Sequence, residues 1–444
     1  MATSAGRPLS LQCRPRIRLA KLANCPCNSM PPAAVRAASR STRPSSGAEP
    51  AATTRRKVPA SRLGGLQPGQ LPGNPRYFSS TTSDRSGPSG SKYVYNVAAS
   101  YIAKGKPYDP TAHVFHFNPY NRVQPPKPGR EKSSRPESGQ DAFFVSRLGT
   151  NPGEVALGVA DGVGGWMDSG VDPADFSHAF CDYMAKTAHE YKPGQGSALT
   201  ARELMKRGYE AVCHDGIIKA GGSTAVVGLL SENGVLEVAN LGDSGFIVLR
   251  LNGVHTASEP QTHAFNTPFQ LSVVPKSMLM RAAAFGGAQL MDQPRDAEVT
   301  RHRLKHGDVV VFASDGLWDN LFNQDILRIV SQAMAKSGAW ETTDSGVQVA
   351  ADLTPYTGLD KTANNEATTS KSGGRPIVTL QSTIASEIVG AAKSASMNAK
   401  LDGPFAKEVK KYYPHEPWHG GKEDDICAVV VLVSEEEAPI KAKL

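Results

Sequence analysis

Residues 308–320 read DVVVFASDGLWDN, an apolar run that stops at an aspartate beside a glycine. The β-branched stretch Asp308–Ala313 predicts a strand that is buried on both faces. A carboxylate at the end of such a strand is costly unless its charge is compensated, and Gly316 allows the chain to turn sharply beside it. The stretch therefore predicts a buried strand that delivers the carboxylate of Asp315 to a site at its end.

Three further segments have a similar form, in which a short apolar run ends or begins at an aspartate next to glycine or another aspartate. A single Asp-Gly pair is usually only a turn, but four such segments without a cluster of His or Cys indicate a shared site. Carboxylates, backbone carbonyls and water form the oxygen-rich ligand set that Mg²⁺ and Mn²⁺ prefer. The sequence therefore predicts a divalent-metal site built from GVADGVGG (158–165), NLGDS (240–244), ASDGLWDN (313–320) and GGKEDDI (420–426).

Charge is distributed unevenly along the 444 residues. Residues 1–83 contain 13 Arg and Lys against one acid, Glu49, a net charge of +12, whereas the rest holds 36 basic and 41 acidic residues. A tail rich in Arg, Ser, Ala and Pro is typical of a mitochondrial transit peptide. Residues 14–23 can form a short basic amphipathic helix, and Arg76-Tyr77-Phe78-Ser79 resembles a matrix-protease cleavage pattern. We therefore expect 1–83 to be a transit peptide and disordered tail, and the protein to be mitochondrial, in the matrix.

The composition excludes several classes of protein. Apolar runs are short: Ile426–Val433, which includes Ala428–Val433, has only eight residues, far below the roughly 20 that cross a bilayer as a helix. The body lacks a basic face with interleaved aromatic residues, so no nucleic-acid partner is expected. Six cysteines, three of them in the tail and the others far apart, form no disulfide framework. We expect a monomer without a transmembrane segment.

The body of the chain, residues 92–434, combines strand and helix patterns. Asn233-Gly234 between two β-branched runs predicts a hairpin. Helices are expected after Asp172-Pro173, an N-cap followed by proline, and after Thr200, whose capping box is completed by Glu203. Hairpin-linked strands with helices between blocks indicate an α+β fold, in which helices cover antiparallel sheets. The predicted strands are Phe143–Val145, Val155–Ala160, Thr224–Leu230, Val235–Ala239, Phe246–Leu251, Asp308–Ala313 and Ile426–Val433.

Two stretches are predicted to lie outside the ordered core of this domain. Residues 341–375 are rich in Thr, Ser and Gly and poor in apolar residues, which predicts a disordered insertion. Residues 435–444 are expected to form a C-terminal tail.

The aspartate-containing motifs occur in an order that resembles a known family. ADGVGGW (160–166), GGSTAVVGLL (221–230), NLGDSG (240–245), FASDGLWDN (312–320) and DDICAVVVLV (424–433) together resemble the metal-dependent serine/threonine phosphatases of the type 2C (PPM) family. The segments GVDPADFS (170–177) and FNTPFQLS (265–272) are similar to its mitochondrial branch. The resemblance implies a four-layer α-β-β-α sandwich of antiparallel sheets flanked by helices. It also implies hydrolysis of phosphoserine and phosphothreonine on mitochondrial proteins, by a hydroxide that two Mg²⁺ or Mn²⁺ ions activate.

The resemblance also implies roles for individual residues. Asp161 would bridge the two metal ions, and the carbonyl of Gly162 would bind one of them. Asp315 and Asp424 would bind the other ion. Asp425 is the alternative to Asp424 as a ligand. Asp161, Asp315 and Asp424 are therefore the expected catalytic set.

The remaining candidate positions carry open alternatives. Asp243 would lie at the edge of the site, as a partner of the ligands, a ligand of a weak third ion or merely a turn residue. Gln140-Asp141 stands where the family usually has Glu-Asp; Gln140 brings no charge, so one metal is expected to bind more weakly. Val163 replaces a His proposed as general acid in many members, and Arg135 lies one residue out of register with the family's phosphate-binding Arg. These departures leave a catalytically weak pseudo-phosphatase, a phosphoprotein-binding module, as the alternative.

Overall fold

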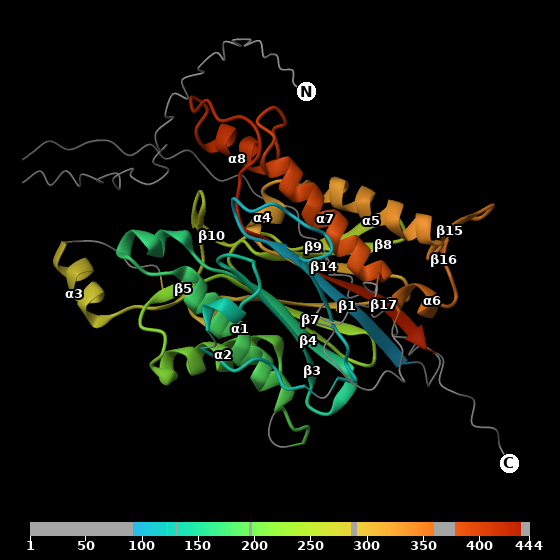
Figure 1. Ribbon diagram of the computed structural model, residues 1–444, viewed down its shortest axis with the longest axis horizontal. Helices are drawn as coiled ribbons and strands as arrows, with labels where there is room; N and C mark the ends of the chain where they lie inside the picture. The colour runs from blue at the N-terminus through green and yellow to red at the C-terminus, as the bar shows by residue number, and fades with distance from the viewer. Residues whose placement is uncertain are drawn as a thin grey trace, which may run out of the picture. The chain divides into compact units, whose positions relative to one another are not determined.

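The computed structural model describes residues 92–121, 123–129, 131–194, 198–285, 291–358 and 378–436. The described residues all belong to one of two units of the chain, residues 82–444. The predicted transit peptide, 1–83, lies outside the described residues. The described unit is built on two antiparallel sheets, which Figure 1 shows stacked between helices.

The first sheet has six strands in the order β2-β1-β17-β14-β8-β9. Its two long strands, β1 and β17, pair along their whole length, from Lys92 opposite Glu436 to Ile102 opposite Ile426. The end of β17 at Glu436 extends the domain two residues into the predicted tail, whose remainder lies outside the described residues. The strands are β1 (Lys92–Ile102), β2 (Val114–His116), β8 (Gly245–Arg250), β9 (Gly253–Ala257), β14 (Val309–Ala313) and β17 (Ile426–Glu436).

The second sheet has five strands in the order β13-β7-β6-β4-β3. Its inner face packs against the first sheet, where Leu157 and Val159 of this sheet and Phe312 of the first sheet are fully buried in one core cluster. The hairpin predicted at Asn233-Gly234 joins β6 to β7 and is confirmed, with Gly234 at a φ of 77°. The strands are β3 (Asp141–Leu148), β4 (Asn151–Asp161), β6 (Ala225–Leu230), β7 (Val235–Leu241) and β13 (Glu298–Arg303).

Helices cover both outer faces of the stacked sheets. The helices α1 (Pro173–His189) and α2 (Ala201–Asp215) pack on the five-stranded sheet, while α5 (Asn323–Ser337) and α7 (Leu380–Ser396) pack on the six-stranded sheet (Figure 1). The predicted α+β class and four-layer sandwich are confirmed. The shorter elements are β5 (Gly221–Ser223), β10 (Thr262–Ala264), β11 (Thr267–Pro268), β12 (Leu271–Val273), α3 (Lys276–Phe285), α4 (Asp315–Trp318) and α8 (Pro404–Tyr412).

The two predicted helix starts are correct, although one capping box is incomplete. Asp172 accepts a hydrogen bond from the backbone N–H of Ala174 at the start of α1. Thr200 accepts one from the N–H of Glu203 at the start of α2. The Glu203 carboxylate accepts from Arg207, one turn further along the helix, so the expected box is only half formed.

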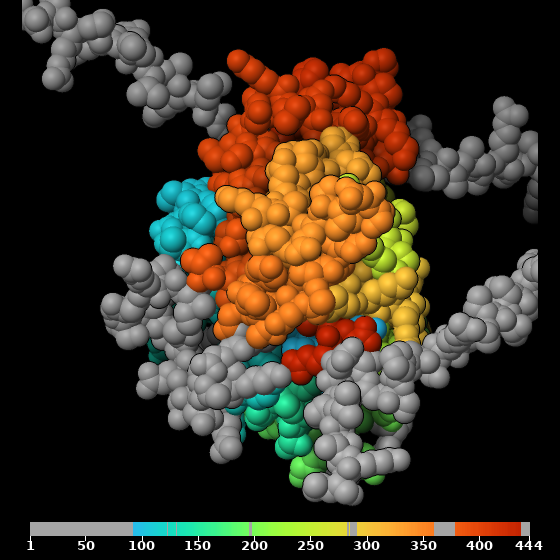
Figure 2. All heavy atoms as spheres, turned by 90° about the vertical axis from the view of Figure 1, so that its right-hand side faces the viewer, coloured from blue at the N-terminus to red at the C-terminus, as the bar shows by residue number. Residues whose placement is uncertain are grey.

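The prediction that residues 341–375 are disordered is wrong for residues up to 358. The hairpin of β15 (Trp340–Thr343) and β16 (Gly346–Val349) and the helical turn α6 (Thr354–Thr357) occupy this part of the chain. Trp340 and Leu353 anchor it, because both side chains are buried in the core below α5 and α7. Figure 2 faces this side of the molecule and shows the segment, in orange, on the domain surface. Residues 359–375 lie outside the described residues.

Candidate active site

Four carboxylate-bearing segments meet at one edge of the stacked sheets. Ala313, the last residue of β14, lies opposite Ala428 of β17, so Asp315 after β14 and Asp424 before β17 share that edge. In the other sheet, Asp141 and Asp161 are paired at the ends of β3 and β4. Antiparallel neighbours bring the end of one strand beside the start of the next. Segments far apart in sequence therefore deliver their carboxylates to one place.

The side chain of Asp141 is buried at this edge, and the neighbouring Asp161 is half-buried. Burial raises the pKa of Asp161 well above its ordinary value, and the nearby charges of Asp315, Asp141 and Asp424 raise it further. Burial, followed by the charge of Asp425, raises the pKa of Asp141 in the same way. Mutual repulsion of this kind indicates a site built to be neutralised by positive charge.

The clustered carboxylates surround one ammonium group. Lys422 Nζ lies 2.6 Å from Asp315 Oδ2, 2.7 Å from Asp319 Oδ2 and 3.2 Å from Asp424 Oδ2. Burial alone would raise the pKa of Asp315, but the charge of Lys422 and its hydrogen bond outweigh this effect, so the pKa is lowered. Burial raises the pKa of Asp319 to about 7 despite the same lysine. Lys422 is the cation that this part of the cluster holds.

Asp243 lies in the turn between β7 and β8, at the rim of the cluster. Burial and the charges of Asp315 and Asp319 raise its pKa to about 8. Its Oδ1 atom is buried without a hydrogen-bond partner. Beside it, Ser244 Oγ lies 2.7 Å from Thr224 Oγ1, which accepts from the N–H of Asp161 at 3.1 Å. Asp243 therefore lies close enough to the carboxylate cluster for the charges of Asp315 and Asp319 to act on it.

The two adjacent aspartates before β17 have different surroundings. Asp425 accepts hydrogen bonds from the N–H groups of Lys104 at 2.6 Å and Gln140 at 2.8 Å. A methyl group on Gly139 would lie 2.0 Å from Asp425 Oδ1, so only glycine leaves room for this arrangement. Asp424 instead faces the ammonium of Lys422. The geometry favours Asp424 over Asp425 as a ligand.

The remaining predicted positions lie around this centre. Gln140 directs its side-chain N–H toward the sulfur of Met167 at 3.2 Å. Gly162 packs against the first turn of α1, where an added methyl group would lie 2.9 Å from Pro173. Arg135 donates to Asp175 on the same turn at 2.9 Å, and its Nε is buried without a partner.

The donor set fits a hard divalent cation. It consists of carboxylates, with the unpartnered oxygens Asp141 Oδ1 and Asp243 Oδ1 buried among them, and Mg²⁺ and Mn²⁺ favour such oxygen ligands. In the part of the chain that the structure describes, no three His, Cys, Asp or Glu side chains are arranged as ligands around one metal position. Three carboxylates instead surround the ammonium group of Lys422, which supplies positive charge where a metal ion would otherwise supply it.

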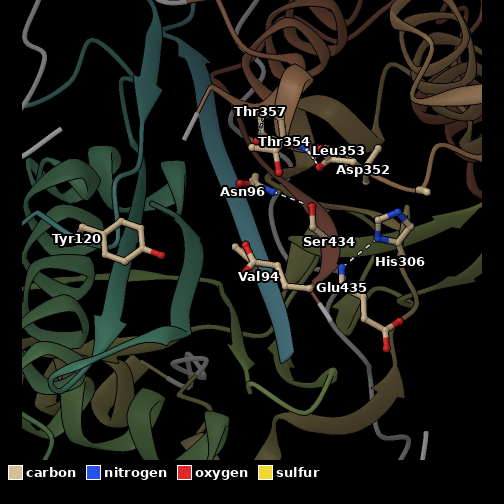
Figure 3. Close-up of a pocket in the computed structure, with 12 residues that line it drawn as sticks. Val94, Asn96, Tyr120, His306, Asp352, Leu353, Thr354, Thr357, Ser434 and Glu435 are labelled. Carbon is tan, nitrogen blue, oxygen red and sulfur yellow. Dashed lines mark hydrogen bonds between the residues drawn. The ribbon is translucent and has the colours of Figure 1, made fainter. Parts of the chain in front are cut away.

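A pocket at the opposite end of β17 lies far from the carboxylate cluster. Figure 3 shows Asn96 donating to Ser434 Oγ and the N–H of Glu435 donating to His306 Nδ1. The pocket lies beside the start of β1 and the end of β17, whereas Asp424 precedes β17. The strand has 11 residues, which at about 3.3 Å per residue separates the two places by on the order of 30 Å. The pocket is therefore not part of the carboxylate site.

Comparison with known proteins identifies the family. A model of the family described as Protein phosphatase 2C matches residues 128–352, which is half of the chain. The chain belongs to the protein phosphatase 2C family. The family predicted from the five motifs is thus confirmed, and the protein is a metal-dependent protein phosphatase.

Two phosphatases show the same relationship by sequence, and a solved structure aligns with the chain. Protein phosphatase 2C homolog 7, mitochondrial, of Saccharomyces cerevisiae is 32% identical over 303 residues, 68% of this chain and 76% of the yeast protein. Protein phosphatase PTC7 homolog fig of Drosophila yakuba is 32% identical over 312 residues, 70% of this chain and 80% of the fly protein. The X-ray structure of the photosystem II phosphatase PBCP aligns with 76% of this chain and 98% of its own, with a TM-score of 0.49 and 21% identity. Within the described residues of this phosphatase, no helix is both long and apolar enough to cross a membrane.

Two residues of this phosphatase site were missed by sequence reasoning. Asp319 and Lys422 fall within the motifs ASDGLWDN (313–320) and GGKEDDI (420–426), but the sequence assigns neither of them a role. Both lie close to a predicted ligand, Asp319 four residues after Asp315 and Lys422 two before Asp424. The short separation in sequence between each charged residue and a predicted metal ligand was the signal that could have identified both residues.

Proposed function

We propose that this phosphatase hydrolyses phosphoserine and phosphothreonine on mitochondrial proteins, with two Mg²⁺ or Mn²⁺ ions held at the carboxylate edge. The observation that carries the proposal is the meeting of Asp161, Asp315 and Asp424 from three segments at one place. Family membership supports the reaction, and the oxygen-only donor set supports the choice of metal.

The ligand roles are distributed between the two sheets. Asp161 would bridge the ions, the Gly162 carbonyl would bind one of them, and Asp315 and Asp424 would bind the other. When bound, such ions supply the positive charge that activates water and stabilises the phosphoryl oxygens in the transition state. Asp243 lies where it can support these ligands.

The protein itself holds this arrangement rigid. The Asp161 N–H donates to Thr224 Oγ1, which ties the end of β4 to β6. Ser314 Oγ donates to Asp141 Oδ2 at 2.6 Å and thereby links the two sheets beside Asp315. Fixed ligands of this kind avoid reorganisation when charge develops in the reaction. Arg135, held by Asp175, is proposed only as a phosphate-binding residue near the α1 turn.

The proposed location is the mitochondrial matrix. The net charge of +12 over residues 1–83 and the pattern Arg76-Tyr77-Phe78-Ser79 support import followed by cleavage. The similar yeast protein is named as mitochondrial. We further propose that the enzyme acts as a monomer. N-terminal sequencing of the protein from purified mitochondria should begin close to Ser79, and a cytosolic protein that keeps residues 1–83 would contradict import.

Turnover of phosphopeptides tests the proposed reaction. Purified protein should release phosphate from phosphoserine and phosphothreonine peptides in Mn²⁺ or Mg²⁺, and EDTA should abolish the release. Peptides with phosphotyrosine serve as a control and should be poor substrates. Metal-dependent binding of the phosphopeptides without turnover would instead support the alternative of a pseudo-phosphatase, which the uncharged Gln140 motivates.

A further inference from the structure

The backbone of Lys422 is fixed beside the acidic cluster, and its side chain reaches into the cluster. Asn320 Nδ2 donates to the Lys422 carbonyl at 2.8 Å, and Asn320 Oδ1 accepts from the Lys422 N–H at 3.0 Å. The ring of Phe405, from α8, lies 5.1 Å from the ammonium, and Asn266 Oδ1 lies 3.4 Å from it. The side chain is only 14% exposed. Its position is therefore built by several separate segments of the chain.

The charge on this lysine is secured by its neighbours. Burial by itself disfavours an ammonium group, but carboxylate oxygens of Asp315, Asp319 and Asp424 lie 2.6, 2.7 and 3.2 Å from it and compensate its charge. A buried lysine with three carboxylate partners is a compact point charge with three donors. It therefore offers these oxygens what a metal ion would offer, with a single positive charge instead of two.

We propose that Lys422 is a built-in cation that competes with a divalent ion for Asp315, Asp319 and Asp424, and so weakens the binding of that ion. The inference rests on the divalent-metal site proposed above. An ammonium and a dication repel each other strongly at contact distances. Two of the three carboxylates, Asp315 and Asp424, are among the proposed ligands, so the ion and the lysine draw on the same oxygens. The flexible four-carbon stem of lysine allows the ammonium to withdraw when the ion binds.

A positioning role makes the opposite prediction. If Lys422 only drew the three carboxylates together, its removal would let them move apart, and divalent ions would bind more weakly. If it competes, its removal would free the oxygens and take away a repelling charge, and divalent ions would bind more tightly. The direction of the change in affinity therefore separates the two roles.

Calorimetric titration with Mn²⁺ alone tests the proposal on the whole chain. Lys422→Met should lower the Kd for Mn²⁺ by about tenfold or more, or add one bound ion per chain, because one neighbouring positive charge is removed. Lys104→Met is the matched control: Lys104 Nζ is 3.8 Å from Asp424 Oδ1, and its side chain is 58% exposed. A solvent-exposed pair contributes little, so this control should stay within about twofold of the wild type.

Thermal unfolding keeps the test decisive if Lys422→Met does not fold. Lys422→Gln, which keeps a polar group, should melt at a lower temperature than the wild type in EDTA, because three carboxylates lose their counter-charge. Mn²⁺ should then raise its melting temperature by more than it raises that of the wild type. An unchanged or weaker affinity in the Lys422 variants, with normal Mn²⁺ binding by the wild type, would overturn this inference alone. A wild-type protein that binds no Mn²⁺ would overturn the proposed function and the inference with it.

Discussion

At the scale of single residues, identical side chains acquire different tasks from their hydrogen bonds. Asp424 and Asp425 are neighbours in sequence, yet Asp425 accepts from two distant backbone N–H groups, those of Lys104 and Gln140, whereas Asp424 accepts from the N–H of Asp425 and pairs with Lys422. The bonds that Asp425 accepts fasten the loop after β1 and the start of β3 to the start of β17. Asp425 thus serves the fold, whereas Asp424 keeps its charge directed at the cation position.

Replacing the two aspartates one at a time should show that Asp425 affects stability and that Asp424 affects metal binding. Asp425→Ala leaves two N–H groups without their acceptor, which should lower the free energy of unfolding by about 1–3 kcal/mol. Asp424→Ala should leave the stability of the EDTA-treated protein nearly unchanged, or raise it, and should weaken Mn²⁺ binding. Urea denaturation and calorimetry on both variants check this. The assignment fails if Asp425→Ala is the variant that loses Mn²⁺ affinity at unchanged stability.

Sequence reasoning predicted the acidic positions of the site but not its cation. Asp161, Asp243, Asp315 and Asp424 each end or precede a recognisable apolar run, so local pattern locates them. The partners of Lys422 lie 107, 103 and 2 residues away in sequence. Only the pairing of β14 with β17 brings the first two to it, and no local pattern encodes that contact.

At the scale of elements, the two sheets are interlocked by size complementarity. Gly228 of β6 has no side chain, and the ring of Phe312 from β14 fills the space: a methyl group on Gly228 would lie 2.7 Å from Phe312 Cζ. Both residues lie in the layer between the sheets, where packing is tight. The glycine therefore sets how closely β6 and β14 approach.

A larger residue at position 228 should destabilise the fold, and a smaller residue at position 312 should relieve part of that destabilisation. Gly228→Ala overpacks the layer and should cost about 1–3 kcal/mol of unfolding free energy. Phe312→Leu should be destabilising by itself, but the double variant should be more stable than the sum of the two changes predicts. Gly165→Ala is the control, because an added methyl group there has no neighbour within 4 Å. Strict additivity in denaturant unfolding would show that the two residues are not coupled.

Elements with strong local patterns were predicted well, and those that depend on distant partners were not. The strands flanking Asn233-Gly234 carry β-branched runs and a turn signal, and they formed as predicted. β1 was missed because it carries Asn96 and Ser100 inside a buried strand. Their polar groups are satisfied only by distant partners such as Ser434 and the His113 carbonyl. The hairpin after Trp340 was also missed, because its own sequence is polar and its anchors lie at its edges.

At the scale of the whole molecule, the fold concentrates negative charge at one edge. Asp319 and Asp243 have their pKa values raised to about 7 and about 8, chiefly by burial. A carboxyl group whose pKa is raised in the folded protein binds its proton more tightly there than in the unfolded chain. At these two groups the folded state thus holds more protons than the unfolded one between about pH 4 and 8, so their contribution to stability falls as the pH rises through that window.

Metal removal should expose this pH dependence. In EDTA, the free energy of unfolding should be lower at pH 8.5 than at pH 5.5 by at least about 1.4 kcal/mol, the equivalent of one pKa unit. Asp243→Asn should reduce the difference, because it removes one of the titrating groups. With saturating Mn²⁺ the trend should reverse, since the ion binds the deprotonated carboxylates. Urea titrations at both pH values measure all three cases, and a rise of stability with pH in EDTA would refute the explanation.

We propose that Asp161 joins the carboxylates of both sheets into one metal-dependent phosphatase centre. The most direct test is the rate of phosphothreonine-peptide hydrolysis by Asp161→Asn over a full Mn²⁺ titration, with circular dichroism to verify the fold. Loss of one well-placed electrostatic group typically costs about 10²–10³ in rate, and a shared ligand should cost at least as much. We expect Asp161→Asn to fold, to hydrolyse the peptide more slowly by that factor or more, and not to be restored by high Mn²⁺. A variant with near-normal, EDTA-sensitive turnover would contradict it.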